Sequence, residues 1–245
     1  MKKRRKFILM IILVLAGAIL LINCNFVEPV QYRYAKKLLK EKYNEEFEVL
    51  DTWGNGGKSY YALCYPVRDR SILFEGRFNT EKTTFRDEYD RAIFSKEVKE
   101  IIQPKLTKIF PECYVYPSVL SKESGITDKT DITIESFIKA TESPGVLFIV
   151  AVNNDKYLQD NYPEEYKKII TCMDEMSDIN ISPSLALYFL PEERYKQYVD
   201  YFKNNIKMQG EFSNIVSGYH DFGFGYKDGK PNESEIEYVK SRKEQ

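Results

Sequence analysis

His220 and Asp221 are neighbours in the sequence, and such a pair could supply a general base and the acid that orients it. Phe212–Tyr226 reads as a strand, however, and adjacent strand residues point to opposite faces of a sheet. His220 is the only histidine, so the two- or three-histidine zinc sites of many enzymes cannot form. We therefore interpret His220 as structural and predict no catalytic and no metal-ligating residue.

The segment Thr52–Ser59 (TWGNGGKS) ends like a P-loop, in which a glycine-rich loop binds phosphate between a strand and a helix. Thr52 stands where that motif has its first glycine. The residues that follow, Tyr60–Pro66, have the pattern of a strand and not of a helix. We predict a glycine-rich hairpin turn, and no nucleotide or other cofactor.

Acidic residues are abundant, and some of them fall in pairs. Asp131 and Glu135 would share one face of a helix, and the acids within Asp87–Asp90 lie where a helix N-terminus favours negative charge. A glycosidase needs two carboxylates that face each other across a cleft, which sequence spacing cannot establish. Solvated helix faces account for these acids, and a hydrolase with paired carboxylates remains an alternative.

Tyrosine is the most unusual feature of the composition, with 19 tyrosines and 15 phenylalanines. Aromatic side chains on a sheet can bind glycans or peptides. They also favour strands for reasons of packing alone, so both interpretations remain open. The candidate ligand platform consists of five tyrosines on expected strands: Tyr60, Tyr61, Tyr65, Tyr114 and Tyr116.

Three cysteines, Cys64, Cys113 and Cys172, lie downstream of the N-terminal segment, and Cys24 lies within it. Their spacings are long and no CxxC motif occurs, so neither a zinc ribbon nor a redox dithiol is predicted. One pair could form a disulfide in an oxidising compartment. Alternatively, all three are small buried side chains.

The first half of the chain has the pattern of a helix, an antiparallel meander and a second helix. We expect a helix over 31–45, then three strands joined by tight turns, and a helix over Asp87–Phe110 that Pro104 should kink or divide. The expected strands are Phe47–Trp53, Ser59–Val67 and Ile72–Phe78.

The second half alternates strands with helices, as in an α/β unit. Gly145–Val152 is apolar without alternation, which predicts a central strand covered on both faces. The other expected strands are Glu112–Leu120, Ser184–Leu190 and Phe212–Tyr226, and the expected helices are Thr133–Thr141, Pro163–Met176 and Pro191–Asn204. We predict an α+β fold with boundaries at 1–27, 28–120 and 121–245, the last two of which could form one continuous domain.

The formal net charge of −1 averages two unlike parts of the 245 residues. Residues 2–6 hold five basic side chains and no acid, whereas the remainder holds 31 basic and 37 acidic residues. An acidic exterior argues against nucleic acid as a partner.

Between these parts, Phe7–Ile22 is a run of 16 apolar residues. A helix over the run spans about 24 Å, and extension to Val27 gives about 31 Å, enough for a bilayer core. We expect a signal anchor with the N-terminus inside and residues 28–245 outside. A cleaved signal peptide (Ala16–Ala18) and a lipoprotein with lipidated Cys24 remain alternatives.

Ala35–Val49, a tyrosine-rich hairpin and Ser95–Phe110 follow one another within Tyr34–Pro111. This arrangement resembles small uncharacterised exported proteins of Gram-positive bacteria, which carry an N-terminal anchor or lipoprotein signal ahead of a helix–hairpin–helix unit. The helix-then-hairpin order is also similar to PepSY-type extracytoplasmic modules. The resemblance implies an exported location and an α+β fold, and it implies no activity and no functional residues.

These observations favour a membrane-anchored extracytoplasmic protein without catalytic activity, a module of the cell envelope that binds a protein or polymer partner. Two alternatives belong to other classes. One is an envelope hydrolase with paired carboxylates, and the other is a regulatory or sensor subunit of a membrane protein. A cleft with facing carboxylates would favour the hydrolase, and an aromatic sheet face would favour binding.

Overall fold

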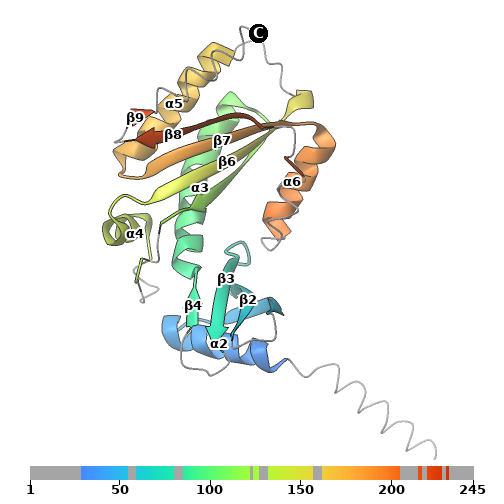
Figure 1. The fold of residues 1–245 in the computed structure, drawn as a ribbon, viewed down its shortest axis with the longest axis vertical. Coiled ribbons are helices and arrows are strands. Elements are labelled where there is room, and N and C mark those ends of the chain that lie inside the picture. The colour runs from blue at the N-terminus through green and yellow to red at the C-terminus, as the bar shows by residue number, and fades with distance from the viewer. Residues whose placement is uncertain are drawn as a thin grey trace, which may run out of the picture.

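The chain has an α+β fold (Figure 1). The computed structural model describes residues 29–54, 59–79, 85–121, 124–126, 132–156, 162–204, 215–216, 220–227 and 230–231. The elements are α2 (Val30–Tyr43), β1 (Phe47–Trp53), β2 (Ser59–Pro66), β3 (Phe74–Asn79), β4 (Phe85–Asp87), α3 (Tyr89–Ile109), β5 (Cys113–Val119), α4 (Ile134–Thr141), β6 (Gly145–Asn153), the 3₁₀ turn η2 (Asn154–Lys156), α5 (Tyr162–Asp178), β7 (Ser182–Leu190), α6 (Glu192–Asn204), β8 (His220–Lys227) and β9 (Lys230–Pro231). None of the described helices combines the length and the apolar character needed to span a membrane. The expected anchor, Phe7–Val27, lies outside the described residues.

The first sheet is an antiparallel meander in the order β1-β2-β3-β4. Its strands alternate buried and less buried residues, because α2 covers one face and leaves the other less covered. The small core beneath α2 is strongly aromatic and includes Tyr43, Phe47 and Phe74. The predicted helix and the three predicted strands are confirmed, with β3 starting two residues later than expected.

The second sheet has the order β5-β6-β7-β8-β9, with β6 and β7 parallel and the other described pairs antiparallel. Helices α3, α4 and α5 pack on one face and form the large core with β5, β6 and β7. Helix α6 covers part of the other face, where Tyr198 and Tyr201 pack against Ala151 of β6. Strand β6 is therefore buried on both faces only over Val150–Asn153, while Gly145–Val150 still alternates.

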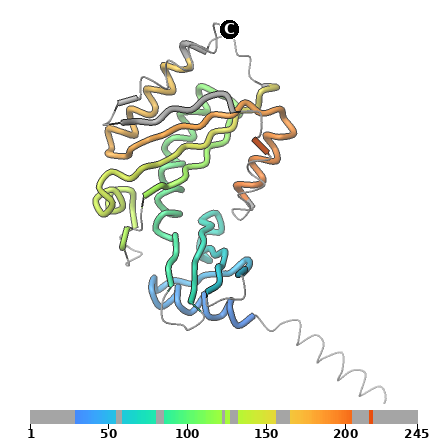
Figure 2. The backbone as a smooth tube through the Cα atoms, in the orientation of Figure 1, coloured from blue at the N-terminus to red at the C-terminus, as the bar shows by residue number. Residues whose placement is uncertain are grey.

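Helix α3 runs from the small sheet to the large one (Figure 2) and contributes side chains to both cores. Tyr89 and Ile93 contribute to the small core, and the residues from Phe94 onward contribute to the large one. Pro104 was expected to kink or divide the helix, and α3 continues through it without division. Helix α3 thus passes from the small core to the large one, and the boundaries at 28–120 and 121–245 stay a prediction.

The junction of the small sheet with α3 contains a buried carboxylate, Asp87. The Tyr43 hydroxyl donates to Asp87 Oδ1 at 2.7 Å, and the Tyr89 backbone N–H donates to the same oxygen at 3.1 Å. The Lys42 ammonium lies 2.9 Å from Oδ2. Both carboxylate oxygens have partners, so this charge joins α2, β4 and α3 and is satisfied within the fold.

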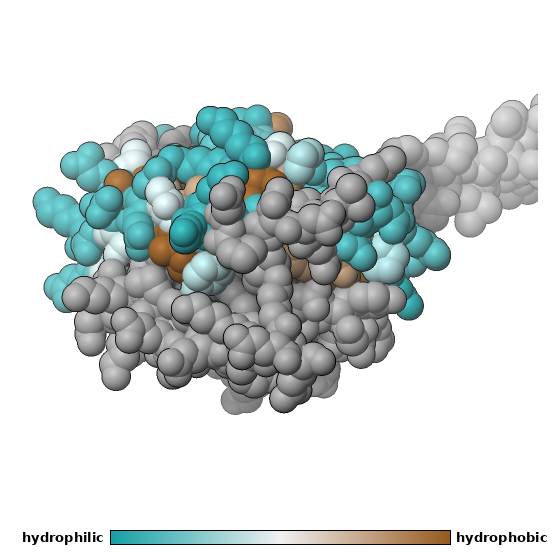
Figure 3. All heavy atoms as spheres, turned by 90° about the horizontal axis from the view of Figure 1, so that it is seen from above, coloured by the Kyte–Doolittle hydropathy of each residue, from teal (hydrophilic) through white to brown (hydrophobic). Residues whose placement is uncertain are grey.

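The described surface seen from above is mainly hydrophilic, with small separate apolar areas (Figure 3). Cys64, Cys113 and Cys172 are free and buried, which agrees with their interpretation as small apolar side chains.

Candidate functional site

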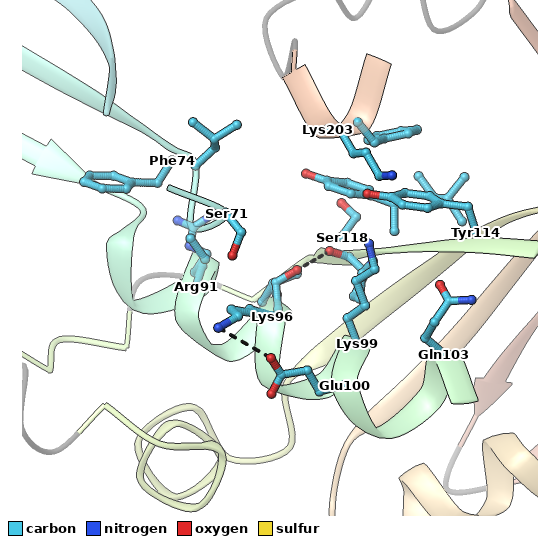
Figure 4. A pocket seen from close by; sticks show the side chains of 18 of the residues that line it. Ser71, Phe74, Arg91, Lys96, Lys99, Glu100, Gln103, Tyr114, Ser118 and Lys203 are labelled. Carbon is cyan, nitrogen blue, oxygen red and sulfur yellow. Dashed lines mark hydrogen bonds and ion pairs between the residues drawn. The ribbon is translucent and has the colours of Figure 1, made fainter. Parts of the chain in front are cut away.

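A groove of about 930 Å³ opens between the two sheets (Figure 4). Its walls are one side of α3, the outward face of β5, the C-terminal turn of α6, and the segment that leads into β3. This volume lies within the range of small-molecule sites and exceeds that of a single ion.

The stripe of α3 that lines the groove recurs every three or four residues, so it forms one face of the helix. From the first to the last lining residue it measures about 24 Å. The lining residues are Glu88, which precedes α3, and Arg91, Ala92, Ser95, Lys96, Lys99, Glu100, Gln103 and Pro104 of α3.

The first part of strand β5 presents alternate residues to the groove: Tyr114 and Tyr116 line it, whereas Cys113 and Val115 are buried in the large core. Beyond Tyr116, all of Pro117–Val119 line the groove. Successive side chains of a β-strand point to opposite faces of the sheet, and the alternation of Tyr114 and Tyr116 with buried residues is visible in the sequence.

Side chains of α3 hold β5 in place along its free edge. The Gln103 amide accepts a hydrogen bond from the Val115 N–H at 2.8 Å and donates one to the Cys113 carbonyl at 2.9 Å. The Ser95 hydroxyl donates to the Pro117 carbonyl at 2.6 Å. These bonds replace those of a further strand, so the edge is protected and the groove is positioned against the tyrosine face of β5.

Two lysines from different helices converge on Tyr114 (Figure 4). The Lys99 Nζ of α3 lies 3.6 Å from the ring centroid, and the Lys203 Nζ of α6 lies 5.9 Å from it. Neither ammonium has a carboxylate within ion-pair distance among the described residues. Burial and, to a lesser extent, the charge of Lys203 together lower the pKa of Lys99 to about 8.

The other cations that line the groove, Lys96 and Arg91, differ from Lys99 and Lys203 because each has a carboxylate partner. Lys96 donates to Asp69 at 2.7 Å and lies 3.4 Å from Glu100. Arg91 donates to Glu88 at 3.2 Å. Burial acts to raise the pKa of Asp69, but hydrogen bonds from Lys96 and from Ser71 outweigh it and lower the pKa to about 2.

An aromatic surface adjoins the lysine pair. The rings of Tyr116 and Phe202 stack with their centroids 4.1 Å apart, and Tyr114 meets Tyr198 edge to face at 6.1 Å. Burial, assisted by the charge of Glu88, raises the pKa of Tyr116 to about 12. This tyrosine therefore stays neutral and acts as an apolar surface with one hydroxyl.

The five tyrosines of the predicted platform fall in three separate places. Tyr114 and Tyr116 line the groove. Tyr61 and Tyr65 lie on the less covered face of the first sheet, where Tyr61 stacks on Trp53 with centroids 5.8 Å apart. Tyr60 is buried beneath α2, donates to the Gln31 carbonyl and stacks on Phe78, so it is a core residue.

The other candidates of the sequence lie elsewhere. Strands β1 and β2 flank the Thr52–Ser59 segment as an antiparallel pair, so the connection is a hairpin and not the strand-to-helix turn of a P-loop. His220 begins β8. Cys24 and Asp131 lie outside the described residues, and so do the side chains of His220 and Asp221. Among the described residues, no group of three or more histidine, cysteine or acidic side chains could hold a metal ion.

Sequence reasoning missed Lys99, Lys203 and Gln103. Lys99 lies between Glu97 and Glu100, which is typical of a solvated helix face. Its position one residue after buried Val98, on the border of the apolar stripe of α3, was the available signal. Lys203 had no such signal, since only the packing of α6 on the sheet brings it to β5.

Neither a protein-family model nor a curated protein matches this chain. The fold resembles the crystal structure of a DUF5037 family protein from Ruminococcus gnavus ATCC 29149, with a TM-score of 0.64 and 17% sequence identity. The match covers 86% of this chain and 98% of that one. At this identity the likeness extends to the fold alone.

Proposed function

We propose that this protein is a membrane-anchored, extracytoplasmic binding module of the cell envelope without catalytic activity. Its groove binds a partner that combines an acidic group with an aromatic or apolar part. The convergence of Lys99 and Lys203 on Tyr114 is the observation that carries the proposal.

A half-buried ammonium ion without a counter-ion is an unfavourable arrangement, because burial removes water that solvates the charge. Lys96, three residues earlier on the same helix, has two carboxylate neighbours, and Lys99 has none among the described residues. An anion bound beside Lys99 would supply the missing counter-ion through a charge-assisted hydrogen bond.

The carboxylates of the groove restrict the kind of anion. Glu75, Glu88 and Glu100 line it together with the lysines, so a densely charged polyphosphate would meet repulsion along much of its length. A ligand with one acidic group at the lysine pair avoids these acids. Its apolar part could then lie on the Tyr116–Phe202 stack.

The location rests on the sequence. Lys2–Lys6 form a basic flank, and Phe7–Val27 is long enough to cross a bilayer, so the N-terminus lies inside and residues 28–245 lie outside. External protease added to intact cells should degrade the described region. Full protection of this region would contradict the orientation.

Calorimetric titration of the full-length chain with 3-phenyllactate tests the groove, because this probe joins one carboxylate to one aromatic ring. We expect binding, and no binding of 2-phenylethanol, which lacks the acidic group. Lys99→Met should weaken the affinity about tenfold, since a charge-assisted hydrogen bond contributes about 1.5–3 kcal/mol.

Lys105→Met is the matched control. Lys105 lies on the same helix but pairs with Glu175 of α5 and does not line the groove. The affinity of the Lys105→Met variant for 3-phenyllactate should equal that of the unchanged chain. Equal affinities of the Lys99→Met and Lys105→Met variants would contradict the proposed site.

The hydrolase alternative finds little support in the groove. Of the three acids that line the groove, Glu88 is bonded to Arg91 and Glu100 is paired with Lys96, so these two do not form the pair of facing free carboxylates that a glycosidase uses.

A further inference from the structure

Lys99 differs from the other lysines of α3. Lys96 and Lys105 each pair with a carboxylate, and Lys108 is exposed to water. The Lys99 amine is half-buried in the groove and lies against the Tyr114 ring, without a hydrogen bond to any described residue. An amine in this position is available to a ligand and is not engaged in the fold.

The titratable groups that line the groove with Lys99 come from each of its walls. They are Glu88, Arg91, Lys96 and Glu100 at and within α3, Tyr114 and Tyr116 of β5, Tyr201 and Lys203 of α6, and Glu75 of β3. Lys96 and Glu100 offset each other, and Gln103 is bonded to β5. Burial is the larger influence on the pKa of Lys99 and the charge of Lys203 the second, and both favour the neutral amine.

A neutral lysine amine is a nucleophile, whereas an ammonium ion is not. Desolvation and a nearby cation are the two environments that activate lysines for attack on carbonyl groups. With its pKa lowered to about 8, Lys99 has about a tenth of its amine neutral at pH 7, far more than an ordinary lysine.

We infer that Lys99 is a nucleophilic lysine that condenses with the carbonyl group of an aldehyde or ketone bearing an acidic group. The inference rests on the proposed function, because the groove must first admit the anion. The ammonium form of Lys99 and the Lys203 charge attract the ligand's acidic group, and the smaller neutral fraction of Lys99 provides the amine that reacts.

The condensation needs no oxidant or reductant. The Nζ lone pair attacks the carbonyl carbon while the C=O π electrons move to oxygen, and a proton passes from nitrogen to oxygen to give a carbinolamine. Loss of water then removes the former carbonyl oxygen together with the two hydrogens that the amine carried, and a C=N bond forms. The imine nitrogen takes up one proton from the solvent and becomes an iminium ion.

The cysteine nearest the groove offers no competing nucleophile. Cys113 is buried, and its burial raises the pKa of its thiol to about 11 in spite of hydrogen bonds from Thr107 and Gln103 that lower it. Its thiolate is therefore scarce near neutral pH, and it faces the large core.

Phenylpyruvate and 3-phenyllactate form a matched pair of probes, because they differ only in a ketone against a hydroxyl group. The full-length chain is incubated with each probe, reduced with borohydride and mapped by peptide mass spectrometry. We expect phenylpyruvate to leave a reduced adduct on Lys99 at least ten times more abundant than on any other lysine. Lys105→Met should be labelled like the unchanged chain.

The outcomes separate the two proposals. Binding of 3-phenyllactate without a phenylpyruvate adduct on Lys99 would overturn the nucleophilic lysine and leave the binding site intact. Adducts spread evenly over surface lysines would overturn it as well. Neither binding nor adduct would overturn both proposals, and labelling that persists at the same yield in Lys99→Met would show that another residue reacts.

Discussion

Asp87 precedes α3 and Lys99 lies within it, and their charges have opposite kinds of surroundings. Asp87 is fully buried, and two hydrogen bonds and an ammonium ion surround it. Lys99 is half-buried and has an aromatic ring and a second cation as its neighbours. The first charge is satisfied by the chain itself and holds α2, β4 and α3 together. The second lacks a counter-ion within the described residues, which makes it suited to a ligand.

The largest effect is expected at Asp87. Asp87→Ala should lower the free energy of unfolding by about 3 kcal/mol, because Tyr43, the Tyr89 N–H and Lys42 lose their shared acceptor. Urea denaturation measures this loss. Asp87→Asn keeps one uncharged oxygen that can accept a hydrogen bond, so this variant should lose less stability than Asp87→Ala. A loss of under 0.5 kcal/mol for the alanine variant would contradict the structural role given to this carboxylate.

A second loss of stability is expected at Gln103, which joins α3 to the edge of β5. Gln103→Leu should lower the free energy of unfolding by about 2 kcal/mol, because the buried Val115 N–H and Cys113 carbonyl are left without partners. The urea midpoint measures the change. Thr171→Val is the control and should cost less, because the exposed Thr171 hydroxyl bonds only to the Lys167 carbonyl of its own helix, α5, among the described residues. Equal losses in the two variants would contradict the edge-capping role.

The comparison is sharpest between Lys96 and Lys99, which lie three residues apart on one helix. Lys96→Met breaks the contact with Asp69 and should lower the free energy of unfolding by about 0.5–1 kcal/mol. Lys99→Met keeps the apolar stem and removes an unpaired charge, so it should leave stability unchanged or raise it slightly. Thermal denaturation of both variants tests this. A greater loss for Lys99→Met would mean that its charge is used within the fold.

The smallest expected effect is on the pH dependence of stability. The pKa of Lys99 is about 8 in the folded chain, below its ordinary value of 10.5, so between these values the unfolded chain binds more protons. Stability therefore rises with pH through this window, and Lys99→Met should lack that contribution. Tyr114 and Tyr116, with pKa values raised to about 12 by burial, stay neutral between pH 8 and 9.5. If the urea midpoints of the unchanged chain and of Lys99→Met change with pH in the same way between pH 8 and 9.5, the prediction is contradicted.

Most helices and strands could be predicted from the sequence, because the apolar periods were clear. Phe47–Trp53 is a strand at the predicted bounds, and Thr133 begins α4 through a capping box with Ser136. Strand β4 was missed because three residues are too few to show a period. The sharing of α3 between two cores was also missed, since periodicity shows that a face is buried but not which partner buries it.

The groove was only half predictable. Tyr114 and Tyr116 stood out because they alternate with apolar residues on a strand, and both line the groove. Tyr60 also lies on a predicted strand and is buried, so a tyrosine on a strand cannot by itself distinguish a site from a core. Lys99 and Lys203 are 104 positions apart in the sequence, and no local rule relates residues at that distance.

The shared helix also affects the order in which the protein can fold. The aromatic core of the small sheet needs Tyr89, whose ring lies about 5 Å from those of Tyr43, Phe47 and Phe74. It also includes Ile132, which follows β5 in the chain. A chain that emerges from its N-terminus must therefore hold its first sheet incomplete until part of the second has appeared. Closing such distant contacts slows folding, and both sheets should then form in a single cooperative step.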